Sequence, residues 1–360
     1  MHTYTLSNLR RLFLSLILII SGFGVVIAQD SIPEQSTKKP LEKAAFESGY
    51  FIADRTVSLP PAKTLEAVIQ HDFGTIQSHW TDIYGLWGAS NIRIGLNFTI
   101  TKDLQVGFGT TKMKMLQDFS IKYVIVRQRQ GGFPVTIAFY GNVALDARNK
   151  SSLGNNKLSS DLDFNSIVKD TAFQRSIANQ VVQNDTNYAL NYITYNQAAG
   201  LKGANVSDLG SLFDHTFKAS YRFSYFAEFM IARRFCKEFS AQLAISWVHY
   251  NLVDQTTMEN NHVNGGINNN INIAGIGKLK ISPQTSIMLS YSQPLMTYLN
   301  TAPWPNMGLG VEISTSTHAF QIFLTSANGL VPQETIMYNP NNPYNGAILL
   351  GFNITRLWTF

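Results

Sequence analysis

Few residues of this 360-residue chain have a type and a spacing suited to chemistry. His71 and His79 stand near Asp72 and Asp82, and imidazole and carboxylate groups together could bind a metal ion or a haem. Their spacing fits no strict ligand motif, so rim histidines at an interface are the simpler interpretation. The chain contains no Gly-x-Ser-x-Gly, Walker, Cys-x-x-Cys-His or His-Glu-x-x-His sequence. We therefore predict no catalytic residue, no cofactor and no metal site.

A second set of ionisable residues is defined by alternation instead of a motif. Each lies on the polar face of a segment in which apolar residues recur at every second position. If these segments form a barrel, the polar face points inward. The candidate lumen-lining residues are then Glu66, Arg93, Lys122, Arg222, Glu228, Lys278 and Glu312, with Asp72 and Lys280 on the same parity. Such mixed charges either pair across a wet interior and hold the barrel together, or order opposite charges around a narrow pore.

The elements that position these charges are two-faced β-strands. Residues 91–100 place Ile92, Ile94 and Leu96 on one face, opposite Arg93 and other polar or small residues. The pattern resumes over residues 104–111 after three turn residues, which predicts a hairpin. Twelve such segments of about ten residues follow one another between residue 65 and the C-terminus, and about ten residues is the length at which a tilted strand crosses a bilayer.

The connections between the predicted strands alternate in length. Short ones are expected at residues 101–103, 128–134, 236–238, 282–284 and 314–317, and longer ones at 74–90, 146–215, 293–305 and 327–344. Short periplasmic turns and long outer loops are typical of outer-membrane barrels. With an even number of strands both ends of the chain lie on the periplasmic side. The terminal Phe360 is expected to be recognised by the barrel-assembly machinery.

Composition agrees with this fold class. The chain is 45% hydrophobic but only 14% charged, it has one cysteine, and its formal net charge is +5. These values exclude a disordered chain, a disulfide scaffold and a strongly basic nucleic-acid-binding protein. A soluble antiparallel sandwich would also show alternating faces. The scarce charge on the polar faces and the aromatic residues near strand ends favour a membrane barrel in contact with lipid.

The N-terminus has the features of an export signal. Arg10 and Arg11 precede an apolar run over residues 12–28, which predicts a cleaved signal peptide over residues 1–28 and residence in the outer membrane. An uncleaved anchor is the alternative, because a mostly apolar run of about 17 residues is close to the minimum for spanning a bilayer. Residues 29–63 are interpreted as a periplasmic lead-in, and residues 64–360 as the barrel.

Residues 147–214 form an insertion too long for an ordinary loop. Phe173, Ile177 and Val181 recur at a spacing of four, which predicts a short amphipathic helix. The insertion could pack on the barrel rim, fold into the lumen as a plug, or bind a ligand outside.

Several phrases, in their order along the chain, resemble an uncharacterised family of outer-membrane β-barrel domains of Gram-negative bacteria, a domain of unknown function. Among them are Leu59, Pro60, Ala62, Lys63 and Thr64, then Gln70, His71, Asp72, Phe73 and Gly74, Ser90 to Gly95, Ile231 to Phe235, Gln242 and Leu243, Val248 to Val253, His318 to Gln321, and Gly351 to Arg356. The resemblance implies a barrel and no assigned activity.

The expected fold is therefore an all-β, transmembrane, antiparallel up-and-down barrel of about twelve strands. The function it favours is a narrow, porin-like passage for small solutes. The alternative is a closed structural or surface-binding barrel with the 147–214 insertion as plug or ligand-binding loop. A hydrolase with its active site at the rim is a third hypothesis that no motif supports.

Overall fold

The computed structural model describes residues 39–149, 153, 157–159, 219–254, 257–259, 262–264, 268–296 and 303–360. The predicted signal peptide and nearly all of the 147–214 insertion, including its expected helix, lie outside the described residues. Within the described part, no helix is long and apolar enough to cross a membrane.

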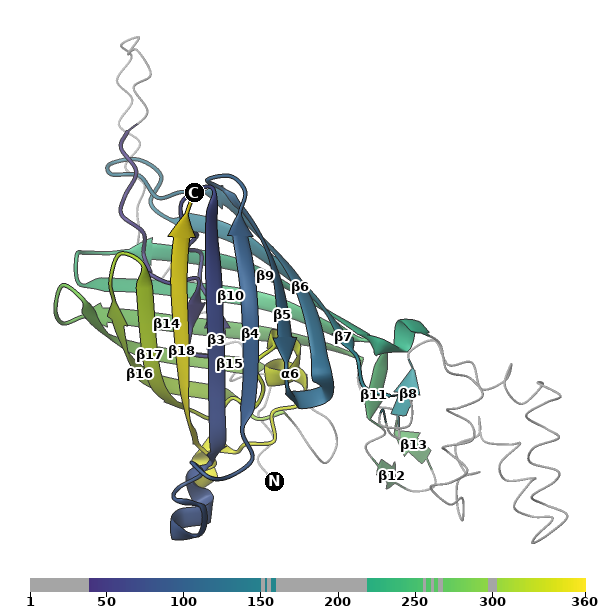
Figure 1. The fold of residues 1–360 in the computed structure, drawn as a ribbon. Coiled ribbons are helices and arrows are strands. Elements are labelled where there is room, and N and C mark those ends of the chain that lie inside the picture. The colour runs from purple at the N-terminus through teal and green to yellow at the C-terminus, as the bar shows by residue number, and fades with distance from the viewer. Residues whose placement is uncertain are drawn as a thin grey trace, which may run out of the picture. The chain divides into compact units, whose positions relative to one another are not determined.

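The alternating segments form a closed antiparallel barrel of twelve strands among the described residues (Figure 1). In chain order the strands are β3 (Thr64–Thr75), β4 (Asn91–Thr99), β5 (Leu104–Thr111), β6 (Leu116–Val126), β7 (Thr136–Asp146), β9 (Phe223–Arg234), β10 (Phe239–Tyr250), β14 (Asn269–Lys280), β15 (Thr285–Pro294), β16 (Asn306–Ser314), β17 (His318–Thr325) and β18 (Leu349–Thr359). Consecutive barrel strands pair along the chain, and β18 pairs with β3 from Thr359↔Thr64 onward. The predicted fold class is confirmed.

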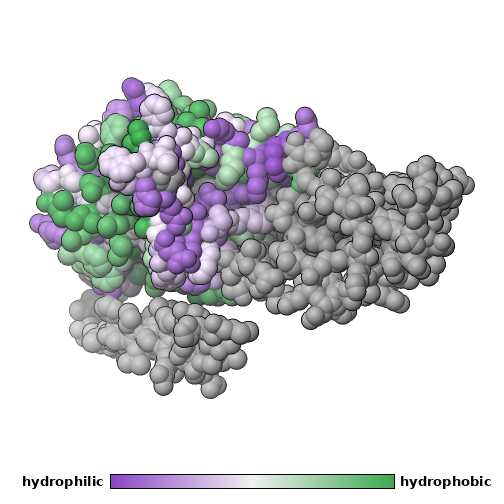
Figure 2. Space-filling model, turned by 90° about the horizontal axis from the view of Figure 1, so that it is seen from below, coloured by the Kyte–Doolittle hydropathy of each residue, from purple (hydrophilic) through white to green (hydrophobic). Residues whose placement is uncertain are grey.

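The two faces of each strand differ in burial as the alternation predicts. In β4 buried and outward-facing residues alternate along the whole strand, so that Arg93 is buried while Ile94 and Leu96 are exposed on the outside. Residues such as Ile322 and Leu289, which are 62% and 60% exposed, would be costly in water, and a lipid environment removes that cost. In Figure 2, hydrophobic residues gather mainly at the left of the visible surface, and many hydrophilic residues lie nearer the middle.

The two ends of the barrel differ. One end, which we call the turn end, carries the short connections after β4, β6, β9, β14 and β16 and also the C-terminus (Figure 1). The other, the loop end, carries the longer connections, which include the short helices η1 (Ile76–Asp82), η6 (Ala219–Arg222), α6 (Pro332–Met337) and η7 (Pro343–Asn345) and the small strands β8 (Lys157–Ser159), β11 (Leu252–Asp254), β12 (Thr257–Glu259) and β13 (His262–Asn264). The connection between β5 and β6, which contains η2 (Met113–Met115), is short although it lies at the loop end.

Aromatic rings gather near the strand ends. His71 stacks on Phe352 beside Phe73, and His249 stacks on Trp247, all toward the loop end. Near the turn end, His318 stacks on Phe320. These groups occupy the levels where the aromatic belts of a membrane barrel meet the lipid headgroups.

Two segments fill the barrel interior. A hairpin of β1 (Tyr50–Phe51) and β2 (Asp54–Arg55) enters from the turn end, and α6 lies inside nearer the loop end (Figure 1). This differs from the plain lead-in expected for residues 29–63. Residues 45–58 include side chains that are almost completely buried, such as Phe46 and Phe51, because the inner wall of the barrel surrounds them.

Candidate functional site: the occupied barrel interior

The hairpin inside the barrel has its own strand pairing and its own tight turn. Tyr50 pairs with Arg55 and Phe51 with Asp54, which leaves Ile52 and Ala53 as a two-residue turn. Ile52 adopts a left-handed backbone conformation with φ 55°, as tight hairpin turns require. The arms are tied together by main-chain and hydroxyl hydrogen bonds, including Thr56 N–H to the carbonyl of Gly49 at 3.1 Å.

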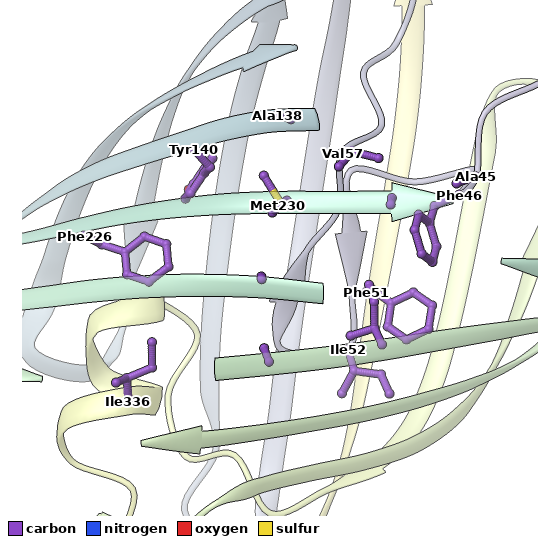
Figure 3. Packing of buried hydrophobic residues seen from close by; sticks show 14 of the residues in the cluster. Ala45, Phe46, Phe51, Ile52, Val57, Ala138, Tyr140, Phe226, Met230 and Ile336 are labelled. Carbon is purple, nitrogen blue, oxygen red and sulfur yellow. The ribbon is translucent and has the colours of Figure 1, made fainter. Parts of the chain in front are cut away.

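Apolar side chains seat the hairpin against one side of the inner wall. Phe46, Phe51, Ile52 and Val57 belong to the same buried cluster as wall residues of β7, β9, β10, β14 and β15, among them Ala138, Tyr140, Phe226, Met230, Ala244, Val248, Ala274, Ile276 and Met288. Figure 3 shows Phe51 and Ile52 inside the barrel among its strands, together with Met230 and Val57 of the same cluster. The interior of this barrel is therefore a packed core at the level of the hairpin.

Two glutamines of the wall bind the main chain of the hairpin. Gln321 on β17 donates to the carbonyl of Tyr50 at 2.8 Å and accepts from the N–H of Ile52 at 3.3 Å. Gln242 on β10 donates to the carbonyl of Arg55 at 2.7 Å and accepts from the N–H of Val57 at 2.9 Å. Each amide thereby satisfies one donor and one acceptor of a buried backbone.

Further wall residues hold the hairpin and the segment just before it. Asn353 donates to the carbonyl of Ile52 at 2.9 Å. Lys122 donates to the carbonyls of Gly49 and Ser58, both at 3.3 Å, and so links the two arms. Lys278 forms an ion pair with Glu47, whose carboxylate also contacts Lys280 at 3.2 Å.

The opposite side of the wall carries a buried ionic network. The guanidinium of Arg93 donates to both carboxylate oxygens of Asp118, at 2.8 and 2.6 Å, and to Gln70 at 3.1 Å. Asn142 donates to the same carboxylate at 3.0 Å. A Cβ atom on Gly109 would lie 2.2 Å from Arg93 Nη2, so glycine at that position leaves room for the guanidinium.

Glu66 is held separately by amides. Asn97 and Gln105 donate to its Oε2 at 2.9 and 3.2 Å. Asn97 also donates to the hydroxyl of Tyr50 at 3.1 Å, which connects the wall to the hairpin.

The second arm of the hairpin carries two charged residues, Asp54 and Arg55, inside the barrel. Arg55 is 2% exposed, and its guanidinium faces the rings of Tyr50 at 4.4 Å and Tyr140 at 5.6 Å. Burial raises the pKa of the Asp54 carboxyl to about 6, against the opposing effects of the neighbouring Arg55 charge and of a hydrogen bond from Ser290. Glu228 on β9 interacts electrostatically with both Asp54 and Arg55.

The segment around α6 occupies the interior on the loop-end side. Glu334 forms an ion pair with Lys114 at 2.7 Å and accepts a hydrogen bond from Tyr250 at 2.6 Å. Gln333 donates to Asn142 at 2.8 Å, and Asn306 donates to the carbonyl of Thr335 at 3.0 Å. All six residues of α6 are buried.

The candidate residues expected to line the lumen fall into two groups. Glu66, Arg93, Lys122, Glu228, Lys278 and Glu312 are all buried on inner-wall strands. Arg222 lies apart from them at the end of η6 and donates to the carbonyl of Asp146 at 2.8 Å. Sequence reasoning passed over Asp118, Gln242, Gln321 and Asn353, although each stands at an inward position that the alternation would have identified. The described residues contain no group of His, Cys, Asp or Glu arranged to hold a metal ion.

A pocket of about 720 Å³ lies at the turn end, beside the segment that leads into the hairpin. Its lining comes from that segment and from the turns that follow β6, β9 and β14, and it includes Glu42, Lys43, Arg234, Lys237 and Lys280. Solvent therefore reaches the base of the hairpin from this side.

Comparisons with known proteins found a family model and several similar solved structures. The model of the family described as "Membrane bound beta barrel domain (DUF5777)" matches residues 46–358. Similar solved structures include the NanC porin (6% identity, 82% of this chain and 99% of that chain covered, TM-score 0.41). Another is the COG4313 outer membrane channel from Pseudomonas putida F1 (10% identity, 84% and 97% covered, TM-score 0.41). A third is the KdgM porin in complex with disordered oligogalacturonate (5% identity, 82% and 99% covered, TM-score 0.37). No curated protein matches the chain.

Proposed function

Since the chain belongs to the family of membrane-bound β-barrel domains (DUF5777), we propose that it is an outer-membrane passage for small solutes that the N-terminal hairpin closes. The turn end then faces the periplasm and the loop end faces outward. Glu66, Arg93, Lys122, Glu228, Lys278 and Glu312 would line the passage once the hairpin has left.

The observation that carries this proposal is how the hairpin is attached. β1 and β2 form a sheet of their own and share no ladder with the barrel. The wall holds them through side chains, and the strand pairing nearest to the hairpin is a single bridge between Leu41 and Arg129 at the turn end. The hairpin can therefore leave without breaking the hydrogen bonds that close the barrel, whereas a structural core strand could not.

The α6 segment would act as a second constriction. It belongs to a loop between β17 and β18 and is held by the Lys114–Glu334 ion pair and by polar contacts with the wall. A full passage requires this segment to move as well, and its many polar contacts are of the kind that water can replace.

Export and insertion complete the proposal. We expect residues 1–28 to be removed as a signal peptide and Phe360 to guide the chain to the barrel-assembly machinery. Replacing the last residue would then lower the amount of barrel inserted in cells without changing its refolding in detergent.

Current recordings in planar bilayers test the proposal. The refolded chain should be closed most of the time, with brief openings when the hairpin leaves. Silence of both the intact chain and a variant whose hairpin is displaced would contradict a passage. It would leave the closed barrel as the better interpretation.

The openings should depend on pH through Asp54. Its pKa is about 6 with the hairpin in place, against the ordinary value of 3.8 for an aspartate in water. Docking therefore takes up a proton between these values, and above pH 6 the charged carboxylate disfavours the docked state. Lowering the pH from 7.5 to 5 should favour closure, by about tenfold in the docking equilibrium, because only the docked carboxyl becomes mostly protonated in this range.

Asp54→Asn provides the control for this pH effect. Its neutral side chain cannot titrate, so the variant should be more closed than the original chain at pH 7.5. Its openings should also change little with pH. An unchanged pH dependence in Asp54→Asn would assign the effect to other groups, of which Glu228 and Arg55 face Asp54.

A surface-binding role is favoured by one different observation. Trp80 and Trp87, in the connection between β3 and β4 at the loop end, are 78% and 80% exposed. The backbone between them is constrained, because Ile83 and Tyr84 both have positive φ. If this loop binds a surface ligand, cells that carry the Trp80→Ala variant should no longer bind that ligand, and the conductance of the barrel should be unchanged.

A further inference from the structure

Two glutamines of the wall form hydrogen bonds with the main chain of the hairpin, and both do so in the same pattern. Gln321 binds the carbonyl of residue 50 and the N–H of residue 52. Gln242 binds the carbonyl of residue 55 and the N–H of residue 57. In both cases a single side-chain amide spans a carbonyl and the N–H two residues later.

This pairing is well suited to an extended peptide backbone. A carboxamide presents one acceptor and a donor pair in one plane, and an extended peptide presents a carbonyl and an N–H at fixed spacing along one edge. An ion offers only one of these groups, and an apolar solute offers neither. The two glutamines therefore form peptide clamps, a term used below for Gln242 and Gln321.

Two further wall residues contact the main chain of the hairpin and fit the same class of ligand. Asn353 and Lys122 donate to carbonyls at residues 49, 52 and 58 of the hairpin. None of these contacts depends on which side chains the hairpin carries. The apolar wall opposite accepts Phe51 and Ile52 within a cluster that contains three methionines, Met230 and Met288 on the wall and Met337 on α6, and methionine adapts to side chains of different shape.

We propose that the solutes of this passage are short extended peptides, and that the hairpin occupies their binding site. This inference rests on the proposed function for transport, but peptide binding can be measured without it. The hairpin is then an internal competitor: a peptide enters the clamps only when the hairpin has left them.

The test uses the full chain with the hairpin displaced by Phe51→Asp and Ile52→Asp. The probe is a fluorescent synthetic peptide with the natural sequence of residues 44–59, and binding to the detergent-folded barrel is followed by anisotropy. We expect saturable binding to the displaced variant and at least about tenfold weaker binding to the intact chain, whose own hairpin competes.

Recognition of the peptide through its main chain predicts a specific effect of N-methylation. Methylating the peptide nitrogens at positions 52 and 57 removes both N–H donors to the clamps and keeps every side chain. Loss of two buried hydrogen bonds should weaken binding by about tenfold or more. Methylation at position 47, where the structure assigns no main-chain N–H bond to the clamps, is the matched control on the peptide.

The barrel offers a matched control as well. Gln242→Leu with Gln321→Leu, added to the displaced variant, should weaken binding of the unmethylated peptide and remove the effect of methylation. Gln105→Leu removes a buried inner-wall glutamine that bonds to Glu66 and Thr99 instead of the hairpin, so it should preserve both. Heat-modifiable gel mobility, in which the unheated and the heated sample migrate differently, checks that each variant is folded.

Unrelated peptides decide the class of solute. Peptides of the same length with different apolar residues should bind the displaced variant within about tenfold of the natural sequence, and should enter liposomes that contain it. Binding of the natural sequence alone would overturn the proposal, because the site would then serve only the hairpin. No binding of any peptide while the displaced variant conducts ions would overturn it too, and would leave the passage itself intact.

Discussion

Replacing Phe51 and Ile52 by aspartate is expected to turn a barrel that is closed most of the time into one that opens whenever the α6 segment moves. Both side chains are 1% exposed within the barrel. Docking the altered hairpin would forgo the burial of two large apolar side chains, about 1.5–3 kcal/mol each, and would bury two charges in their place. A loss of about 5 kcal/mol shifts the docked-to-free ratio by more than about a thousandfold.

Single-channel recordings of the two proteins at equal insertion measure this effect directly. Ala44→Asp is the control, since it adds a carboxylate to the same segment at an exposed position. It should leave the chain as closed as before. If the doubly substituted chain is folded and stays closed, the hairpin does not control the passage, and the α6 segment becomes the next barrier to test.

Replacing Arg93 by alanine is expected to destabilise the barrel by about 3–5 kcal/mol, because it leaves the Asp118 carboxylate buried without its cation. Arg93 is 0% exposed and Asp118 is 1% exposed in this pair. Arg93 also donates to Gln70, and Asn142 donates to Asp118, so the network that the substitution disrupts joins the four strands β3, β4, β6 and β7. Urea unfolding of the detergent-folded barrel should show the change as a lower midpoint.

Arg127→Ala is the comparison for this prediction. Arg127 pairs with Asp103 at 3.1 Å, but its side chain is 31% exposed, so its loss should cost less than about 1 kcal/mol. Equal effects of the two substitutions would mean that the Arg93 pair is hydrated inside the barrel. Asp118→Asn combined with Arg93→Met should recover part of the loss, since it removes the unpaired charge.

Alternation along the sequence was enough to predict the barrel wall. In residues 91–99 each polar or small residue alternates with an apolar one, and a single such strand defines which side faces lipid. The same parity identified Arg93, Lys122 and Glu312 as inward residues. It failed for Arg222, which belongs to a short helix before β9, where a period of two has no meaning.

The contents of the barrel could not be predicted in the same way. The arms of the hairpin are two residues each, too short for periodicity to register. Its contacts are also distant in sequence: Ile52 bonds to Asn353, 301 residues later. Such a site exists only after twelve strands have closed, so no local pattern contains it. The position of the wall glutamines in the alternation predicts that they point inward. It does not predict that they bind the hairpin.

The place where the hairpin joins the wall has a consequence for biogenesis. β3 follows the hairpin after Pro60 and Pro61, and β3 pairs with β18, the final strand of the chain. The first and last strands therefore form the seam, which can close only after synthesis and export of the whole polypeptide. The hairpin is tethered beside that seam, so it can be enclosed sideways as the edges zip together and need not thread through a finished pore. A newly assembled barrel would thus enter the membrane already sealed, and the cell would avoid a leak at the moment of insertion.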